Sequence, residues 1–159
     1  MNDFFLIKGS KKDLRIKEAE FFDWLQQTWE HNKPDIKTKN WNDSEIKKLF
    51  KAWNISESHN TKKMKFKIES TVPENTIYFK TSNGNKVSRT FIGHLRNAYA
   101  HLYMEIDPEN NNLHLQDWKE IGKTGLFECT MDAKIPFDFL EKLTKMILKE
   151  YDLSYVKTK

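Results

Sequence analysis

Cysteine, glycine and proline are all scarce in this chain of 159 residues. The single cysteine, Cys129, excludes an intrachain disulfide and a zinc site made of cysteines, and it fits a reducing cytoplasm. The five glycines are scattered, so the chain has no glycine-rich loop of the kind that binds nucleotide phosphates. We find no low-complexity linker either, and the length suits one domain over residues 1–159.

Long apolar runs are also missing. The apolar run at residues 4–7 is too short for a signal peptide or a membrane span. Apolar residues make up 38% of the chain and charged residues 31%, and a chain of this length can still bury a core of its own. We therefore expect a cytoplasmic protein without a membrane partner.

Metal-binding patterns are absent from the sequence. His94 and His101 are seven residues apart, and we find neither an HExxH pattern nor a suitably spaced pair of carboxylates. The sequence therefore predicts no metal ion and no other cofactor. Cys129 alternates with apolar residues, which favours a buried thiol over a nucleophilic one.

Basic residues are in moderate excess, and the excess lies in the first half of the chain. The formal net charge is +4, and residues 1–80 hold 16 lysines and arginines against 12 acidic residues. Residues 81–159 hold 11 of each. Such a balance permits contact with a nucleic acid but does not require it.

Helical periodicity predicts most of the secondary structure. One amphipathic helix is expected to begin near Asp13, and a second is expected to be capped by Asp43 or Ser44. A central helix is predicted over residues 86–106. Pro136 fits the first turn of a last helix, where its missing N–H costs little.

Strands are predicted to be few and short. They are expected at residues 76–79, 113–115 and 125–131. The last two suggest an antiparallel pair joined by a loop over residues 117–124. Together with the helices, this order predicts a mainly α protein, a bundle of four to five helices with a small antiparallel β appendage.

Lysines alternate with apolar residues over positions 62–68. If this segment is a strand, Lys63, Lys65 and Lys67 share one face, while the apolar residues share the other. The lysine face could bind RNA phosphates, or it could be a solvated edge strand protected from aggregation. A helix over the same residues remains an alternative.

The central helix has an apolar face and a polar face. Phe91, Leu95, Ala98 and Leu102 fall on one stripe at about 100° per residue, so this face is expected to be buried. The polar face includes the two histidines His94 and His101, with Arg96 near its other border. Small or short residues lie between these borders, namely Gly93, Asn97 and Ala100.

Arg96-Asn97-x-x-x-His101 on an amphipathic helix resembles the Arg-x4–6-His signature of the HEPN superfamily (higher eukaryotes and prokaryotes nucleotide-binding). The resemblance implies an up-and-down helical bundle with variable insertions, in agreement with the predicted element order. The chain departs from the pattern after the histidine. Family members often have a helix-ending residue there, whereas Leu102 predicts that the helix continues for another turn.

The resemblance implies a metal-independent endoribonuclease. Histidine can move protons near neutral pH, and arginine can bind phosphate oxygens through two N–H groups, which suits His101 as general acid or base and Arg96 as the phosphate clamp. Asn97 is four residues before His101 and is expected to orient its ring. His94 would be an auxiliary base or RNA contact, or a border histidine that is only hydrogen-bonded to its surroundings.

The same resemblance implies partners. In HEPN nucleases two protomers pair and form a composite site, and the strip of small residues at Gly93, Asn97 and Ala100 would suit such a homodimer. RNA would be the substrate, and a toxin or phage-defence role with a nucleotidyltransferase-type antitoxin is consistent with the family. A non-catalytic module that binds RNA or a nucleotide, or that serves only protein interaction, is the alternative.

Overall fold

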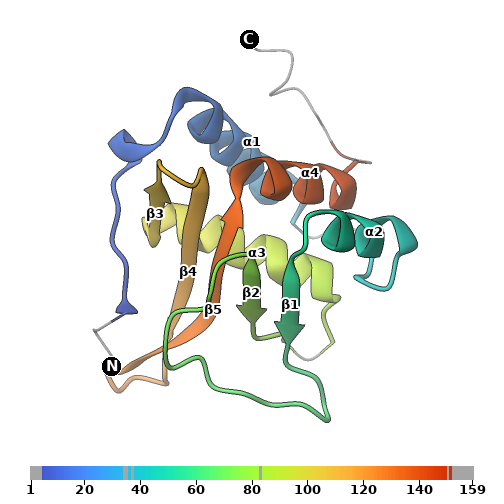
Figure 1. Ribbon diagram of the computed structural model, residues 1–159. Helices are drawn as coiled ribbons and strands as arrows, with labels where there is room; N and C mark the ends of the chain where they lie inside the picture. Colours follow the sequence, from blue (N-terminus) through green and yellow to red (C-terminus); the bar gives the residue numbers. More distant parts are fainter. Residues whose placement is uncertain (1–4, 34–35, 37, 83, 150, 152–159) are drawn as a thin grey trace.

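The computed structural model of the protein describes residues 5–33, 36, 38–82, 84–149 and 151. Over these residues it has a short 3-10 helix η2, four α-helices and five strands (Figure 1). The helices are η2 (Lys11–Asp13), α1 (Ile16–Asn32), α2 (Ser44–Ala52), α3 (Val87–Ala100) and α4 (Phe137–Ile147). The strands are β1 (Ser56–His59), β2 (Thr76–Phe79), β3 (Met104–Asp107), β4 (Asn112–Glu120) and β5 (Phe127–Pro136).

All five strands form a single mixed sheet in the order β1-β2-β5-β4-β3. β1 and β2 pair in parallel, and the other three pairs are antiparallel. The long pair β4 and β5 is at the centre and contains a register shift between Asp117 and Trp118. The sheet therefore joins segments from both halves of the chain.

The prediction of a mainly α, up-and-down helical bundle with a β appendage is wrong: the protein has an α/β fold built around a sheet. The strand at 76–79 forms as predicted, the one at 113–115 is part of the longer β4, and the one at 125–131 begins only at Phe127. The predicted antiparallel pairing of the last two is confirmed, but all three strands belong to one sheet. β1 and β3 complete its two edges. β3 occupies the part of the predicted helix 86–106 that follows residue 103, because α3 ends earlier than its apolar periodicity suggests.

The predicted helices are present, with small shifts at their ends. Asp43 is the N-cap of α2, since its carboxylate accepts a hydrogen bond from the Glu45 amide, and Pro136 is the N-cap residue of α4. The helices α1, α3 and α4 contribute most of the large apolar side chains of the core. Within the described residues no helix is both long and apolar enough to cross a membrane.

Helix α3 crosses behind the strands in Figure 1 and packs on the helix-covered face of the sheet. Its predicted apolar stripe is confirmed for Phe91, Leu95 and Ala98, which are fully buried. Tyr99 also faces the core, where its ring stacks on Phe22 of α1 at a centroid distance of 5.1 Å. The polar residues of α3, among them His94 and Asn97, therefore lie on the opposite side of the helix.

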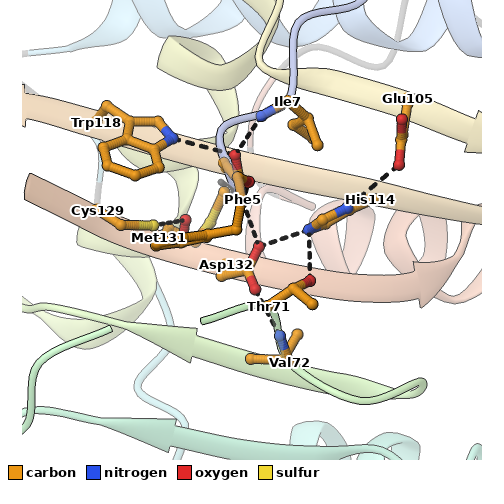
Figure 2. A network of polar contacts seen from close by, with 11 residues as sticks. Phe5, Ile7, Thr71, Val72, Glu105, His114, Trp118, Cys129, Met131 and Asp132 are labelled. Carbon is orange, nitrogen blue, oxygen red and sulfur yellow. Dashed lines mark hydrogen bonds and ion pairs between the residues drawn. The ribbon is translucent and has the colours of Figure 1, made fainter. Parts of the chain in front are cut away.

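The second face of the sheet is covered by two segments without regular structure, residues 5–10 and 66–72. Gln116 of β4 is completely buried there. Its carboxamide nitrogen donates to the Phe5 carbonyl (2.6 Å) and to the Asp132 carboxylate (3.1 Å), and its oxygen accepts from the Ile7 amide (2.9 Å) (Figure 2). Gln116 thus fastens the N-terminal segment to the sheet.

Asp132 of β5 fastens the other covering segment. One carboxylate oxygen lies 2.6 Å from His114 Nε2, and the other accepts from the Val72 amide at 2.7 Å (Figure 2). The segment around residues 62–68 forms neither the strand nor the helix that the sequence left as alternatives. It is a loop whose end is held to the sheet by Val72 and by a single bridge between Ile68 and Cys129.

Replacing Gln116 with alanine should lower the free energy of unfolding by about 1–3 kcal/mol, because buried hydrogen-bonding groups lose their partners. It should also increase amide exchange at Ile7, since that amide donates to Gln116. Urea unfolding and hydrogen exchange measure the two effects. Gln27→Ala on the exposed side of α1 is the control and should change stability by less than about 0.5 kcal/mol; equal losses in both variants would contradict the role of Gln116.

Candidate functional site

The motif histidine lies at the end of α3 rather than within it. The last helical residue is Ala100, and His101 is the C-cap. Leu102 has a left-handed backbone with φ of 60°, and the Tyr103 amide donates to the Ala98 carbonyl at 2.9 Å. These features define a Schellman-type helix end, so the prediction that the helix continues past Leu102 is wrong. Because the helix stops, His101 is exposed.

The imidazole of His101 is accessible. Within the described part of the chain its two ring nitrogens have no hydrogen-bond partner, and the ring lies 5.7 Å from the ring of Tyr103. The Lys8 ammonium group donates to the His101 carbonyl at 2.9 Å and lies 4.6 Å above the Tyr103 ring. A cation and an aromatic ring therefore flank the histidine.

The N-terminal segment fits closely against the turn that follows α3. The Gly9 amide donates to the Leu102 carbonyl at 2.8 Å. A Cβ atom at Gly9 would lie only 1.9 Å from the Met104 carbonyl oxygen, a distance that no side chain can tolerate. Glycine is thus required at this close approach, which places Lys8 beside His101.

Arg96 is held by neighbours on the same chain. Its Nη2 forms an ion pair with Glu30 of α1 at 2.7 Å, and its Nη1 donates to the Asn97 side-chain oxygen at 3.2 Å. Its Nε is buried and has no partner among the described residues. Glu30 is about half exposed, so a bound phosphate could replace it at a small energetic cost.

The sequence predicted that Asn97 orients the ring of His101, but in the structure the Asn97 side chain has other partners. Its side-chain nitrogen donates instead to the Asp117 carboxylate at 3.2 Å, and its oxygen accepts from Arg96. Only its backbone reaches the histidine, because the His101 amide donates to the Asn97 carbonyl at 3.0 Å. Asn97 therefore positions the guanidinium group and not the imidazole.

His94 is fixed on both sides of its ring. Nδ1 lies 2.7 Å from the Asp117 carboxylate, and Nε2 lies 2.7 Å from the Lys80 carbonyl. Since a carbonyl only accepts, Nε2 must donate, and Nδ1 shares a proton with Asp117. Both ring nitrogens are thus in use. Of the two predicted roles, this geometry favours the hydrogen-bonded border histidine over the auxiliary base.

The strip of small residues on α3 is partly used within the chain. A Cβ atom at Gly93 would lie 3.5 Å from the Trp29 ring, so α1 already approaches the helix at this point. Ala100 is exposed and lies next to His101. Of these two small residues, Gly93 thus already contacts α1, whereas Ala100 remains exposed.

Two other reactive groups are held in their protonated forms. Burial raises the pKa of the Cys129 thiol, which donates weakly to the Met131 carbonyl, so the predicted burial of this cysteine is confirmed. Burial and the hydrogen bond to Asp23 raise the pKa of the Tyr99 hydroxyl. Neither group is suited to act as a nucleophile or a base near neutral pH.

Several neighbours of the motif were not identified from the sequence. Asp117 was assigned to a loop, although its alternation with Leu113 and Leu115 could have placed it on the face of β4 that carries these two core leucines. Glu30 and Lys8 are distant in sequence from the motif, and no local pattern indicates their contacts. Lys63, Lys65 and Lys67 are exposed on the loop that follows β1, away from the end of α3.

Comparison with known protein families confirms the resemblance to the HEPN superfamily. The family model described as HEPN pEK499 p136 matches residues 9–157. The chain therefore belongs to this family of HEPN domains. Neither the curated proteins nor the solved structures include a significant match to the chain.

Replacing Gly9 with alanine should displace the N-terminal segment from the turn after α3 and lower the free energy of unfolding by about 1–3 kcal/mol through overpacking. NMR spectra should show shifted amide signals for Leu102 and His101. Gly93→Ala is the matched control, because its new methyl group would meet Trp29 at an ordinary contact distance. If the control is destabilised as much as Gly9→Ala, the close approach at Gly9 is not the cause.

Proposed function

We propose that the protein is a metal-independent endoribonuclease that acts as a homodimer. The main support is the exposed imidazole of His101, whose ring nitrogens have no partner among the described residues and which caps the helix that carries Arg96, in a chain of the HEPN family. An exposed histidine can accept or donate a proton near neutral pH, and arginine stabilises negative charge on a phosphate. These are the two groups that RNA cleavage requires.

The reaction would begin with attack of an RNA 2′-hydroxyl on the neighbouring phosphorus. The 2′-oxygen forms a bond to phosphorus, the bond to the 5′-oxygen of the next nucleotide breaks, and the proton moves from the first oxygen to the second. His101 would move this proton, and Arg96 would stabilise the five-coordinate transition state. The products are a 2′,3′-cyclic phosphate, which can open to a 3′-phosphate, and a free 5′-hydroxyl.

A dimer would supply a second copy of each group. On one helix Arg96 and His101 are five residues apart, which corresponds to about 140° of rotation and about 7.5 Å along the axis. One protomer therefore supplies a single histidine, which would approach the RNA phosphate from one side. Two α3 helices facing each other at Ala100 and His101 would bring a second histidine, so that one acts as base and the other as acid.

The acidic neighbour of Arg96 suggests a second candidate function. The guanidinium group already pairs with Glu30 and contacts Asn97, so in the free protein it is not directed at a substrate. An arginine already paired in this way favours a non-catalytic module that serves protein interaction; in a module that binds RNA or a nucleotide through Arg96 and His101, the phosphate would have to replace Glu30. A toxin or phage-defence role beside a nucleotidyltransferase-type antitoxin is compatible with either function.

Cleavage of RNA in EDTA is the direct test. We expect the wild type to cleave, and both Arg96→Ala and His101→Ala to reduce the rate by about 100-fold or more, as is typical for loss of a catalytic proton donor or phosphate clamp. His31→Ala, an exposed histidine at the end of α1, should retain activity. End-group analysis should find cyclic phosphate or 3′-phosphate, and light scattering should give the mass of a dimer.

Other outcomes would separate the alternatives. If folded wild type never cleaves RNA while Arg96→Ala loses binding, the protein is a binding module. If both alanine variants change only the dimer dissociation constant, the motif is an interface. Cleavage that needs an added divalent ion would contradict the proposed chemistry.

Replacing Glu30 with glutamine should strengthen RNA binding a few-fold, since it removes the carboxylate that competes with phosphate for Arg96. The free energy of unfolding should fall by less than about 1 kcal/mol, because the ion pair is half exposed. Fluorescence anisotropy with a non-cleavable RNA measures the affinity. Weaker binding by Glu30→Gln would indicate that Glu30 instead holds Arg96 in its binding position.

A further inference from the structure

A basic groove lies beside the segment that leads from β2 into α3. It has a volume of about 1040 Å³ and lies between the loop after β1 and the segment after β2. Four lysines line it, Lys62, Lys65, Lys67 and Lys80, and none of its lining residues is acidic. Lys63 does not line the groove, so only two of the three lysines proposed from the sequence take part.

The loop that forms the groove is held in place by Asn60. Its side-chain oxygen accepts from the Phe66 amide at 3.1 Å, and its carbonyl accepts from the Thr81 hydroxyl at 2.8 Å. The Thr61 hydroxyl also accepts from the Met64 amide at 2.8 Å, which closes the turn between these residues. The backbone that carries the lysines is therefore held in place by hydrogen bonds within the chain.

A second cavity adjoins this groove. Lys67 and Lys80 line both, and the second cavity has a volume of about 520 Å³. Its other walls are mostly aromatic or apolar, with Phe5, Trp118 and Phe127 among them, and they also include Glu69 and Glu128. Lys80 is paired with Glu128 at 2.9 Å, whereas the other three lysines are exposed.

We propose that the two cavities together bind a single strand of RNA. The lysines of the groove would contact phosphates, and the aromatic cavity beside Lys67 would receive an unpaired base. Single-stranded nucleic acids are bound in this way, by a positively charged groove combined with aromatic rings on which bases stack. A paired base would have to flip out of its helix to enter the second cavity, at a cost of a few kcal/mol, so the surface should favour single strands over duplexes.

An acidic peptide would also be attracted to the lysines, but it would leave the aromatic cavity unused. This proposal rests on the proposed function, because it assumes that the bound polyanion is RNA. It adds a binding surface separate from the motif. The carbonyl of Lys80 at the groove accepts a hydrogen bond from His94, which precedes His101 by seven residues, about 10 Å along the axis of α3. An RNA strand held in the groove would thus extend toward the site of cleavage.

Binding of a fluorescent 2′-O-methyl RNA of about ten nucleotides tests the proposal, because this probe has no free 2′-hydroxyl and cannot be cleaved. The double variant Lys65→Gln/Lys67→Gln should bind about tenfold more weakly than wild type at low salt. The dependence of log affinity on log salt concentration should lose about 1.4 units of slope, since each phosphate contact to a single strand contributes about 0.7. Annealing the probe to its complement should weaken binding.

The matched control is Lys47→Gln/Lys48→Gln, which removes two exposed lysines from α2 and changes the net charge equally. It should leave both affinity and salt slope unchanged. Equal losses in the two double variants would overturn the proposal, because only the overall charge would then matter. Tighter binding of polyglutamate or of the duplex than of the single strand would overturn it as well.

The proposal of an RNA-binding groove and the proposal of a nuclease can be contradicted independently of each other. If Lys65→Gln/Lys67→Gln binds the probe normally while His101→Ala loses cleavage, the groove proposal is wrong and the nuclease remains. If the groove variant loses binding but folded wild type never cleaves RNA, the binding surface remains and the nuclease is wrong.

Discussion

The buried carboxylate of Asp117 connects the motif helix to the centre of the sheet. It accepts from Asn97 and shares a proton with His94, so two polar side chains of α3 are fixed to β4. Asn97 in turn contacts Arg96, and His94 contacts the backbone of Lys80 at the basic groove. A single carboxylate thus links the residues of the motif to the surface that we assign to RNA, and it sets the rotation of α3 against the sheet. Because buried polar groups are costly to leave unpaired, this arrangement is expected to be rigid.

The motif region separates residues that hold the structure from residues that remain available. His94, His114 and Asn97 resemble catalytic groups in type, yet all three use their side chains in contacts with Asp117 or Asp132. His101 differs because α3 ends beside it and the turn at Leu102 directs the chain into β3. Availability of a polar group, rather than its chemical type, distinguishes the candidate catalytic histidine from its neighbours.

Helix positions and three of the five strands could be predicted from the sequence, whereas the assembly of all five strands into one sheet could not. The helix stripe of Phe91, Leu95 and Ala98 and the cap at Asp43 are local patterns, and each was confirmed. β1 and β3 are four-residue strands with weak apolar alternation, and they form because they pair with the longer central strands. The pairing of Arg96 with Glu30 joins residues 66 positions apart, so it depends on how α1 packs and has no local signal.

The N-terminal segment has a consequence for the order in which the protein folds. Phe5, Ile7 and Lys8 bind residues that follow them by 93 to 111 positions. Contacts between such distant parts of a chain form late, because closing a long loop is entropically costly. During synthesis the first residues leave the ribosome long before β4 exists, and they must wait for it. The contacts of Lys8 and Gly9 beside His101 can therefore form only after residues 101 and 102 have left the ribosome, so a shorter nascent chain would lack a finished site.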